Sequence, residues 1–260
     1  MIDIIRAFYD EIAPDYDDMM ELGFISRLTS IRFQELLVKW FTGGKNVLDI
    51  GCGSGKDALF LGSRGDKVYG FDISPGMIKV ANQKAIAAGL TDTITFSVGD
   101  VNQLQGLNSG RFDGAYSNFN VLNHIPGLSN FAKDLSDQLV PGAVVVLTMA
   151  NRVCLSEIVG YMIRLRFVSA FRKLRSRQNT FSTPMQLYFP KDAAAAFEPY
   201  FNLETIDAFG LLVPPSQLYS GKYFRRFFKI LAMLERPILR TYPFYNFCDI
   251  YILTLKKNEL

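Results

Sequence analysis

A run of alternating glycines, DIGCGSG at residues 49–55, follows a short apolar segment. Glycines after a strand let the backbone approach a ligand closely, and the N–H groups that begin the next helix point towards it. The run fails the dinucleotide fingerprint Gly-x-Gly-x-x-Gly, because Lys56 stands at the sixth position, and Asp57 rules out a Gly-Lys-Ser/Thr phosphate loop. The carboxylate of Asp49 favours a ligand that carries a positively charged amine or sulfonium.

Polar side chains also follow the next three apolar segments. Asp72, Asp100 and Asn118 each come directly after a run typical of a buried strand. If these strands are parallel, their carboxyl ends meet at one edge of the sheet, where ligands of such sheets bind. Taken alone, each residue has a second interpretation, since such side chains also cap the following helix or satisfy a loop backbone.

The single histidine, His124, lies just beyond Asn118. An imidazole can exchange a proton near neutral pH, so His124 is the candidate catalytic base or a ligand of the substrate. The alternative is that it caps a helix starting near Pro126 or packs beneath the cleft. One histidine and three widely spaced cysteines predict no metal site and no disulfide framework, and they favour a reducing, cytoplasmic compartment.

The elements that must position these residues alternate in type over residues 46–150. We expect strands at 46–50, 67–71, 93–98, 112–117 and 143–150. Helices are expected between them at 56–64, 75–88 and 128–139, the last closed by Pro141-Gly142. This rhythm is typical of a doubly wound parallel sheet. Residues 1–42 predict helices, one up to about Ile12 and another over about 26–41.

The rhythm breaks after residue 150. We expect one or two helices in 152–191, strands at 203–213 and 249–257, and a helical stretch over 214–247. The interpretation is one domain over 1–260, with an N-terminal helical cap (1–45), a ligand-binding core (46–150), two closing strands, and two lid or cap segments (151–195 and 214–247).

The segment DIGCGSG resembles motif I of the class I S-adenosylmethionine (SAM) dependent methyltransferases. The resemblance extends over about residues 8–150 and includes FDISPGM at 71–77, GDV at 99–101, and FYDEIAPDYD at 8–17, which is similar to the segment that closes over the cofactor in small-molecule members. It implies a Rossmann-like α/β fold with a mostly parallel seven-stranded sheet and a helical cap or insert.

The resemblance also implies roles for individual residues. Asp72 would bind the ribose hydroxyls, Asp100 and Val101 the adenine, and the glycines the methionine part of SAM, near Asn118. The full set of expected cofactor-binding residues is Tyr16, Asp49, Gly51, Cys52, Gly53, Gly55, Asp72, Ile73, Met77, Asp100, Val101 and Asn118. Cys52 is expected to be a small packing residue and not a nucleophile.

The acceptor is less defined. No Asn/Asp-Pro-Pro-Tyr/Phe motif follows the fourth strand, where the chain reads NFNV at 118–121, so planar amines of nucleobases and glutamine lose support. The resemblance then implies methyl transfer to an O or N atom of a small molecule, with S-adenosylhomocysteine (SAH) as product. A non-catalytic protein that binds SAM and a lipid methyltransferase at a membrane surface are the alternatives.

The charge of the chain is divided unevenly. Residues 1–151 carry a net charge of −5, whereas residues 152–240 carry +8, and no acidic residue lies between Glu157 and Asp192. Aromatic residues interleave with the basic ones in two stretches, around 163–177 and 222–229. Three interpretations remain: helices packed on the sheet with solvated basic faces, a lid over an acidic or apolar substrate, or contact with an anionic membrane or RNA. Nucleic acid is disfavoured, because no appended binding module is visible. Oligomeric state is left open.

Overall fold

The computed structural model describes residues 2–22, 24–106, 111–171, 177–180, 183–215, 218 and 224–259. The alternating pattern over 46–150 forms the expected elements. The strands are β1 (Asn46–Ile50), β2 (Lys67–Asp72), β3 (Ile94–Val98), β4 (Phe112–Ser117) and β5 (Leu139–Ala150). The helices between them are α4 (Lys56–Gly62), α5 (Pro75–Ala87), the 3₁₀ helix η2 (Val101–Gly106), η3 (Val121–His124) and α6 (Leu128–Gln138).

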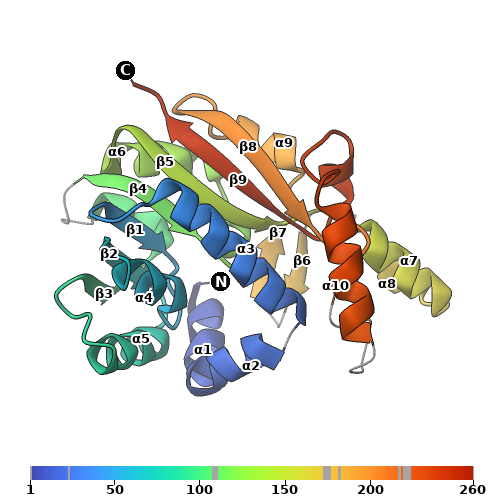
Figure 1. The fold of residues 1–260 in the computed structure, drawn as a ribbon, viewed down its shortest axis with the longest axis horizontal. Coiled ribbons are helices and arrows are strands. Elements are labelled where there is room, and N and C mark those ends of the chain that lie inside the picture. Colours follow the sequence, from blue (N-terminus) through green and yellow to red (C-terminus); the bar gives the residue numbers. More distant parts are fainter. Residues whose placement is uncertain are drawn as a thin grey trace.

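Seven strands make one twisted sheet in the order β3-β2-β1-β4-β5-β9-β8 (Figure 1). The five strands from β3 to β5 pair in parallel. Strand β9 (Ile250–Lys257) is antiparallel to both of its neighbours, β5 and β8 (Phe201–Phe209). The sequence-based expectation of a mostly parallel, seven-stranded Rossmann-like sheet is therefore confirmed.

Apolar side chains cover both faces of the sheet, as a buried parallel sheet requires. Successive residues of a strand point to opposite faces. Val47 therefore joins a cluster with α3 (Phe24–Trp40), α4 and α5, whereas Leu48 and Ile50 join a cluster with α6 and α9 (Pro190–Ala195). Ser74 caps α5 by accepting a hydrogen bond from the Met77 backbone N–H at 3.0 Å. Because helices pack on both faces, the open edge for a ligand is the one where β1 to β4 end.

The N-terminal segment is helical, as expected. It contains α1 (Ile2–Ile12), η1 (Ala13–Asp15), α2 (Tyr16–Leu22) and α3 (Phe24–Trp40), and α3 lies across one face of the sheet (Figure 1). Among the described residues, no helix has the length and apolar character needed to cross a bilayer.

Strand β5 begins earlier than its sequence predicts. Pro141 and Gly142 lie inside the strand and do not end the preceding helix, which stops at Gln138. The pairing with β4 shifts there, from Phe112 opposite Leu139 to Gly114 opposite Val144. This irregularity accommodates the proline, which cannot donate to a neighbouring strand.

The region from 152 to 191 was expected to be helical and is only partly so. Helices α7 (Leu155–Ile163) and α8 (Phe167–Ala170) are followed by a hairpin of β6 (Arg177–Thr180) and β7 (Thr183–Gln186), then by α9 (Pro190–Ala195). The hairpin was missed because its strands lack apolar alternation. Arg172, Lys173 and Arg175 of the basic stretch lie outside the described residues.

The closing strand expected at 203–213 ends at Phe209. Gly210 has a positive φ of 83°, and the Glu235 carboxylate accepts hydrogen bonds from the N–H groups of Gly210 and Leu212 at 3.1 and 2.7 Å. These donors are thereby lost to strand pairing. The stretch 214–247 is helical in part, in α10 (Phe224–Glu235) and the 3₁₀ helix η6 (Phe244–Phe247).

Candidate cofactor-binding and active site

A cavity of about 320 Å³ lies at the carboxyl ends of β1 to β4, between the sheet and helices α1 and α2. Its size lies at the lower end of the range for small-molecule sites. Twelve of the thirteen residues expected at the site line it: Tyr16, Asp49, Gly51, Cys52, Gly53, Asp72, Ile73, Met77, Asp100, Val101, Asn118 and His124. Residues from four separate strand ends and from the N-terminal segment thus meet in one cleft.

Gly55 is the exception, because it does not line the cavity. Its φ is 77°, and a β-carbon there would lie 2.6 Å from Cζ of Phe96 and 3.0 Å from Cβ of Ala81. Gly55 is therefore needed for the turn into α4 and for packing beneath the loop, and its expected contact with the cofactor has no support in this arrangement.

The glycine loop brings its backbone to the cavity surface. The N–H groups of Gly51 and Cys52 both donate to the carbonyl of Phe71 at 2.9 Å, which ties the loop to the end of β2. Gly51 has a φ of 71°, and a β-carbon there would lie 2.6 Å from Cγ2 of Val121. A side chain at residue 51 would thus meet Val121, the first residue of η3 and itself part of the cavity wall.

Asp72 organises the loops around it. Its two carboxylate oxygens accept hydrogen bonds from the Gly53 N–H at 3.0 Å and the Ser74 N–H at 2.9 Å. Burial raises the pKa of Asp72 above its ordinary value, although these two amide donors oppose the shift. A carboxylate oxygen accepts more than one hydrogen bond, so the side chain retains acceptor capacity towards the cavity.

Two more buried carboxylates stand behind the loop. Asp49 accepts a hydrogen bond from the hydroxyl of Tyr116 at 2.9 Å, and Asp57 accepts from the amides of Asn118 and Gln34 at 2.8 and 3.0 Å. Burial raises the pKa of both carboxyls, and the charge of Asp57 raises that of Asp49 further.

With the half-buried Asp72, these two buried groups place three carboxylates around one cavity, and among the described lining residues only Lys56 is a lysine or arginine. Such a site favours a cationic ligand.

The N-terminal helices close the cavity from the other side. Asp10 accepts hydrogen bonds from the Ser74 hydroxyl at 2.6 Å and the Gly76 N–H at 2.7 Å. Asp17 accepts from the Ser54 hydroxyl at 2.5 Å and pairs with Lys84 at 2.6 Å. These contacts join α1 and α2 to the glycine loop and to α5.

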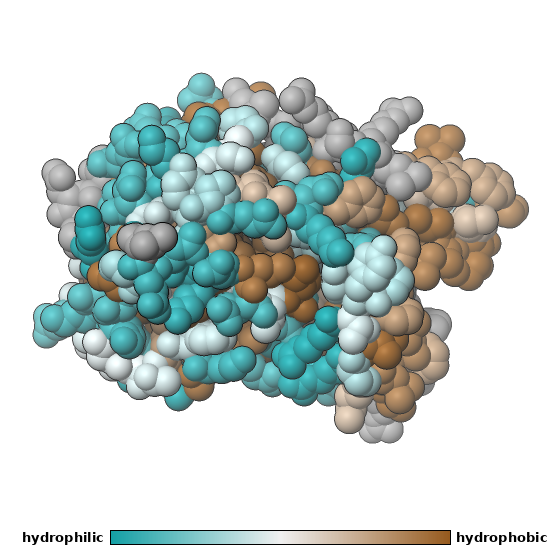
Figure 2. All heavy atoms as spheres, turned by 90° about the horizontal axis from the view of Figure 1, so that it is seen from above, coloured by the Kyte–Doolittle hydropathy of each residue, from teal (hydrophilic) through white to brown (hydrophobic). Residues whose placement is uncertain are grey.

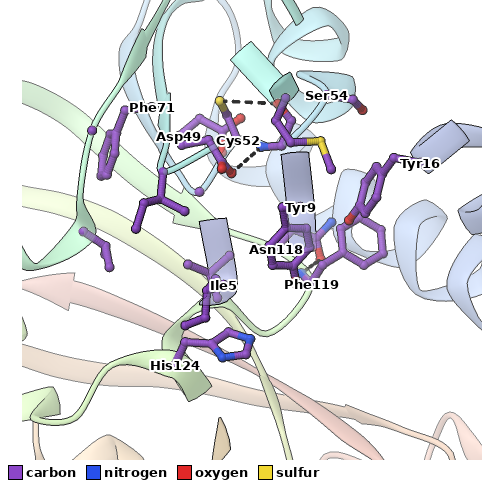
Figure 3. A pocket seen from close by; sticks show the side chains of 18 of the residues that line it. Ile5, Tyr9, Tyr16, Asp49, Cys52, Ser54, Phe71, Asn118, Phe119 and His124 are labelled. Carbon is purple, nitrogen blue, oxygen red and sulfur yellow. Dashed lines mark hydrogen bonds between the residues drawn. The ribbon is translucent and has the colours of Figure 1, made fainter. Parts of the chain in front are cut away.

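Tyr9 and Tyr16 line the cavity from this cap, with ring centroids 6.5 Å apart (Figure 3). Burial raises the pKa of Tyr9 to about 12 and that of Tyr16 higher still, and the charge of Asp72 contributes to both shifts. The two phenols therefore keep their protons at neutral pH. They line the cavity as protonated phenols that can donate hydrogen bonds, and they are unsuited to act as bases at neutral pH.

Asp100 and Asn118 lie at the ends of β3 and β4. Asp100 accepts hydrogen bonds from the backbone and side-chain N–H groups of Asn102 at 2.9 and 2.8 Å, which shapes the loop into η2. The Asn118 amide donates to Asp57, and its oxygen accepts from the Phe119 N–H at 2.8 Å. Asn118 therefore holds both the carboxylate and the strained loop beyond it, where Phe119 has a positive φ of 53°.

His124 ends η3 and lines the same cavity. Its neighbour Asn123 anchors η3, because its side chain accepts from the Ala150 N–H at 2.8 Å and donates to the Gln186 carbonyl at 2.7 Å. In Figure 3 the imidazole lies beside Ile5, away from Asp49 and Cys52. The histidine thus belongs to a part of the cavity wall that is distinct from the glycine loop.

Cys52 lines the cavity with a thiol whose pKa burial raises well above its ordinary value, an effect that Asp49 and Asp72 reinforce. A thiol in this state is a poor nucleophile. The expectation that Cys52 packs and does not react remains consistent with its surroundings.

Sequence reasoning missed several lining residues. Asp57 and Ser54 follow directly from the glycine loop, and an acidic residue in the first turn of a helix that begins at a ligand loop is a usable signal. Phe119 and Asn102 lack such a signal, since only the folded loops bring them to the cavity.

The buried charge at Asp49 leads to a prediction on stability. A folded-state pKa above the unfolded value means that the ionised carboxyl destabilises the fold at neutral pH, and that this penalty fades as pH falls through the raised pKa. We expect Asp49→Asn, whose amide oxygen can still accept from Tyr116, to melt above the wild type at pH 8 in the absence of ligand. The gap should narrow towards pH 5 in thermal scans.

The exposed Asp92→Asn serves as the matched control for this prediction, and its melting temperature should follow the wild type at both pH values. A gap between Asp49→Asn and the wild type that does not change with pH would contradict the assignment of a buried, penalised carboxylate.

These features fit SAM. The carboxylates of Asp49, Asp57 and Asp72 suit its sulfonium and ammonium groups, and Asp72 has acceptor capacity for a diol. The backbone of Gly51 lies so close to Val121 that a side chain at residue 51 would not fit. Asp72 would hold the ribose, Asp100 and Val101 would border the adenine, and the loop with Asp49 would face the methionine part.

Comparisons with known proteins agree with this arrangement. Residues 47–142 match a methyltransferase domain family. A ubiquinone biosynthesis O-methyltransferase of Psychrobacter cryohalolentis is 34% identical over 127 residues, which cover 47% of this chain and 49% of that protein. A 2-phytyl-1,4-naphtoquinone methyltransferase of Synechococcus elongatus is 33% identical over 149 residues, which cover 54% and 61%.

The chain therefore spans about half to three fifths of the length of these curated relatives. Among solved structures, magnesium protoporphyrin IX methyltransferase from Synechocystis PCC 6803, with bound SAH, superposes with a TM-score of 0.62 over 98% of this chain and 99% of that one, at 18% identity. That likeness concerns the fold. The sequence match shows that residues 47–142 carry a methyltransferase domain, and the strand order and the acidic cleft agree with the class I, Rossmann-like, SAM-dependent kind.

Proposed function

We propose that the chain transfers the methyl group of SAM to a hydroxyl oxygen of an apolar aromatic small molecule. The observation that carries this proposal is the division of the cavity wall. One part, at the glycine loop, carries the carboxylates of Asp49, Asp57 and Asp72, and another, where the apolar Ile5 lies beside His124, is away from Asp49 and Cys52 (Figure 3). An acidic part suits the cofactor and an apolar part suits the acceptor.

SAM supplies a methyl group already activated by the sulfonium. The protein then has to align the acceptor and remove its proton. His124 is the residue in the apolar part that can take a proton at neutral pH, whereas Tyr9 and Tyr16 retain theirs. Tyr9 and Tyr16, held by the contacts of Asp10 and Asp17, would exclude water from the reacting groups.

The relatives support an acceptor with a ring and an apolar substituent. The names of the two relatives refer to quinones, and one of them names an O-methylation. Ile2, Ile5 and Met20 of the cap also line the cavity, and their apolar side chains can contact such a substituent. Cys52, Cys154 and Cys248 form no disulfide with one another, in keeping with a reducing, cytoplasmic compartment as part of this proposal.

The experiment offers the purified chain SAM together with a panel of hydroxylated aromatic acceptors and measures released SAH by chromatography. We expect release with a prenylated quinol and little with a catechol that lacks the apolar chain. A matched reaction with the quinol methylated at both oxygens controls for SAM breakdown. SAH binding without release on any acceptor of the panel would contradict the proposal and favour a SAM-binding protein without turnover.

A further inference from the structure

A large apolar surface lies at one end of the molecule. We define the end patch as the exposed apolar residues within 159–171, which include the turn between α7 and α8, together with those of α10: Val159, Met162, Ile163, Leu165, Phe167, Val168, Phe171, Phe227, Ile230, Met233 and Leu234. Figure 1 places α7, α8 and α10 together at one end, and Figure 2 shows hydrophobic residues gathered at that end. Both parts pack on the same segment, since Ser156 donates to the Val213 carbonyl at 3.3 Å and Phe228 packs on Val213.

The exposure is extreme for such side chains. Val168 is 89% exposed, Ile163 78%, Leu165 76% and Met233 73%. Single exposed apolar residues are normal on a protein surface, but a contiguous group of this kind marks an interaction site. The patch is therefore a surface that some partner covers.

Backbone geometry holds the tip of the patch in place. Leu165 has a positive φ of 57°, which is unfavourable for a residue with a β-carbon. The guanidinium of Arg164 donates to the carbonyls of Gly160, at 3.3 Å, and Leu218, which fastens the turn to the neighbouring segment. The chain thus keeps Ile163, Leu165 and Val168 exposed in a fixed turn.

Helix α10 shows a second, opposite arrangement of apolar residues. On its inner side Phe228 is buried, and Leu231 and Ala232 pack against the cluster that Phe228 forms with Val213. On its exposed side Phe227, Ile230 and Leu234 recur at helical spacing. A helix that only packed on the sheet would be polar on its outer side. Here the outer side is apolar, with Lys229 exposed next to it.

Charge identifies the partner. Exposed Arg166 lies within the tip, no acidic residue lies between Glu157 and Asp192, and residues 152–240 carry a net charge of +8. Contact with a second copy through this patch would bring two basic surfaces together. A bilayer with anionic lipids accepts the apolar side chains and attracts exposed cations such as Arg166 and Lys229.

We propose that the end patch docks the protein on the surface of an anionic membrane, with α7, α8 and α10 inserted to the depth of the headgroups. The α7–α8 turn and the outer side of α10 are the contacting elements. Docking does not depend on methyl transfer, so its test needs no acceptor.

The experiment measures cosedimentation of the full chain with phosphatidylcholine vesicles, with and without phosphatidylglycerol. We expect binding to the anionic vesicles at low salt and release at high salt, because the Debye length falls from about 30 Å at 0.01 M to about 3 Å at 1 M. Ile163→Glu with Val168→Glu should weaken binding about tenfold or more, since two anionic side chains replace inserted apolar ones. Arg166→Gln should weaken it about fivefold.

Matched controls are Ile86→Glu and Lys79→Gln on α5, both exposed and away from the patch. They should bind like the wild type. SAH affinity and circular dichroism report folding of every variant, and are expected to be unchanged.

Three outcomes would overturn the proposal. The first is that the wild type does not bind vesicles at low salt. The second is that the patch variants and the control variants lose vesicle binding to the same extent. The third is that the wild type binds no vesicles but forms a dimer, which the double variant Ile163→Glu with Val168→Glu dissociates. The last result would assign the patch to a second copy of the chain.

Discussion

Asp72→Ala is expected to lower the affinity of the chain for SAH by about 100-fold or more, because hydrogen bonds to a charged group contribute about 1.5–3 kcal/mol each. The carboxylate does two things at once. It accepts from the N–H groups of Gly53 and Ser74, and it lines the cavity with capacity for further donors. Without this carboxylate, the N–H groups of Gly53 and Ser74 lose their common acceptor, and the ribose diol of the ligand loses its hydrogen-bond partner. Calorimetric titration with SAH measures the loss.

Asp92→Ala is the matched control, because Asp92 is exposed and precedes β3 at the opposite end of the strand. It should bind SAH as the wild type does. Far-ultraviolet circular dichroism and the melting temperature without ligand separate a lost contact from a lost fold. Wild-type affinity in a folded Asp72→Ala variant would remove Asp72 from the site, and no SAH binding by the wild type would remove SAM from the cavity.

His124→Ala is expected to reduce kcat by about 10²- to 10⁴-fold on a hydroxyl acceptor, the range typical of a lost general base. SAH affinity should stay within about threefold, since the imidazole lies away from the glycine loop in Figure 3. The wild-type pH profile of kcat should show an ionisation on its acidic side that the variant lacks. Acceptor turnover across pH, followed through SAH release, measures both effects.

His124→Gln serves as a second variant, because glutamine keeps polar groups at the position but cannot take up a proton at neutral pH. If His124 is the base, both variants should show a reduced kcat and should lack the ionisation on the acidic side of the pH profile. A residue that only binds the acceptor predicts a raised KM in His124→Ala, with kcat and the pH profile kept. Unchanged turnover in both variants at every pH would end the catalytic assignment.

Much of the site was predictable because it depends on local patterns. The glycines at 51 and 53 need positive φ, and the sequence places them directly after an apolar strand. Asp72 and Asp100 follow two further strands, and parallel strands bring their carboxyl ends to one edge. The resemblance to methyltransferases then assigned a ligand to that edge, which the domain match supports.

Other contacts depend on residues far apart in the chain. Asp57 meets Asn118 across 61 positions, and Asp10 meets Gly76 across 66. Each of these side chains has several plausible local partners in the sequence alone. Only the packing of α1 on α5 and of β4 beside β1 selects the pairs that form.

The sequence by itself determined the parallel core, its strand ends and the acidic glycine loop, because strand period, glycine conformation and helix capping act within a few residues. The tertiary structure alone decided that Gly55 packs against Phe96, that Asn123 anchors the His124 helix to β7, and that Ile163, Leu165 and Val168 stay exposed. The sequence of an apolar segment is compatible both with packing on a sheet and with contact to a partner. The choice between these depends on which faces of the sheet the other helices have already covered.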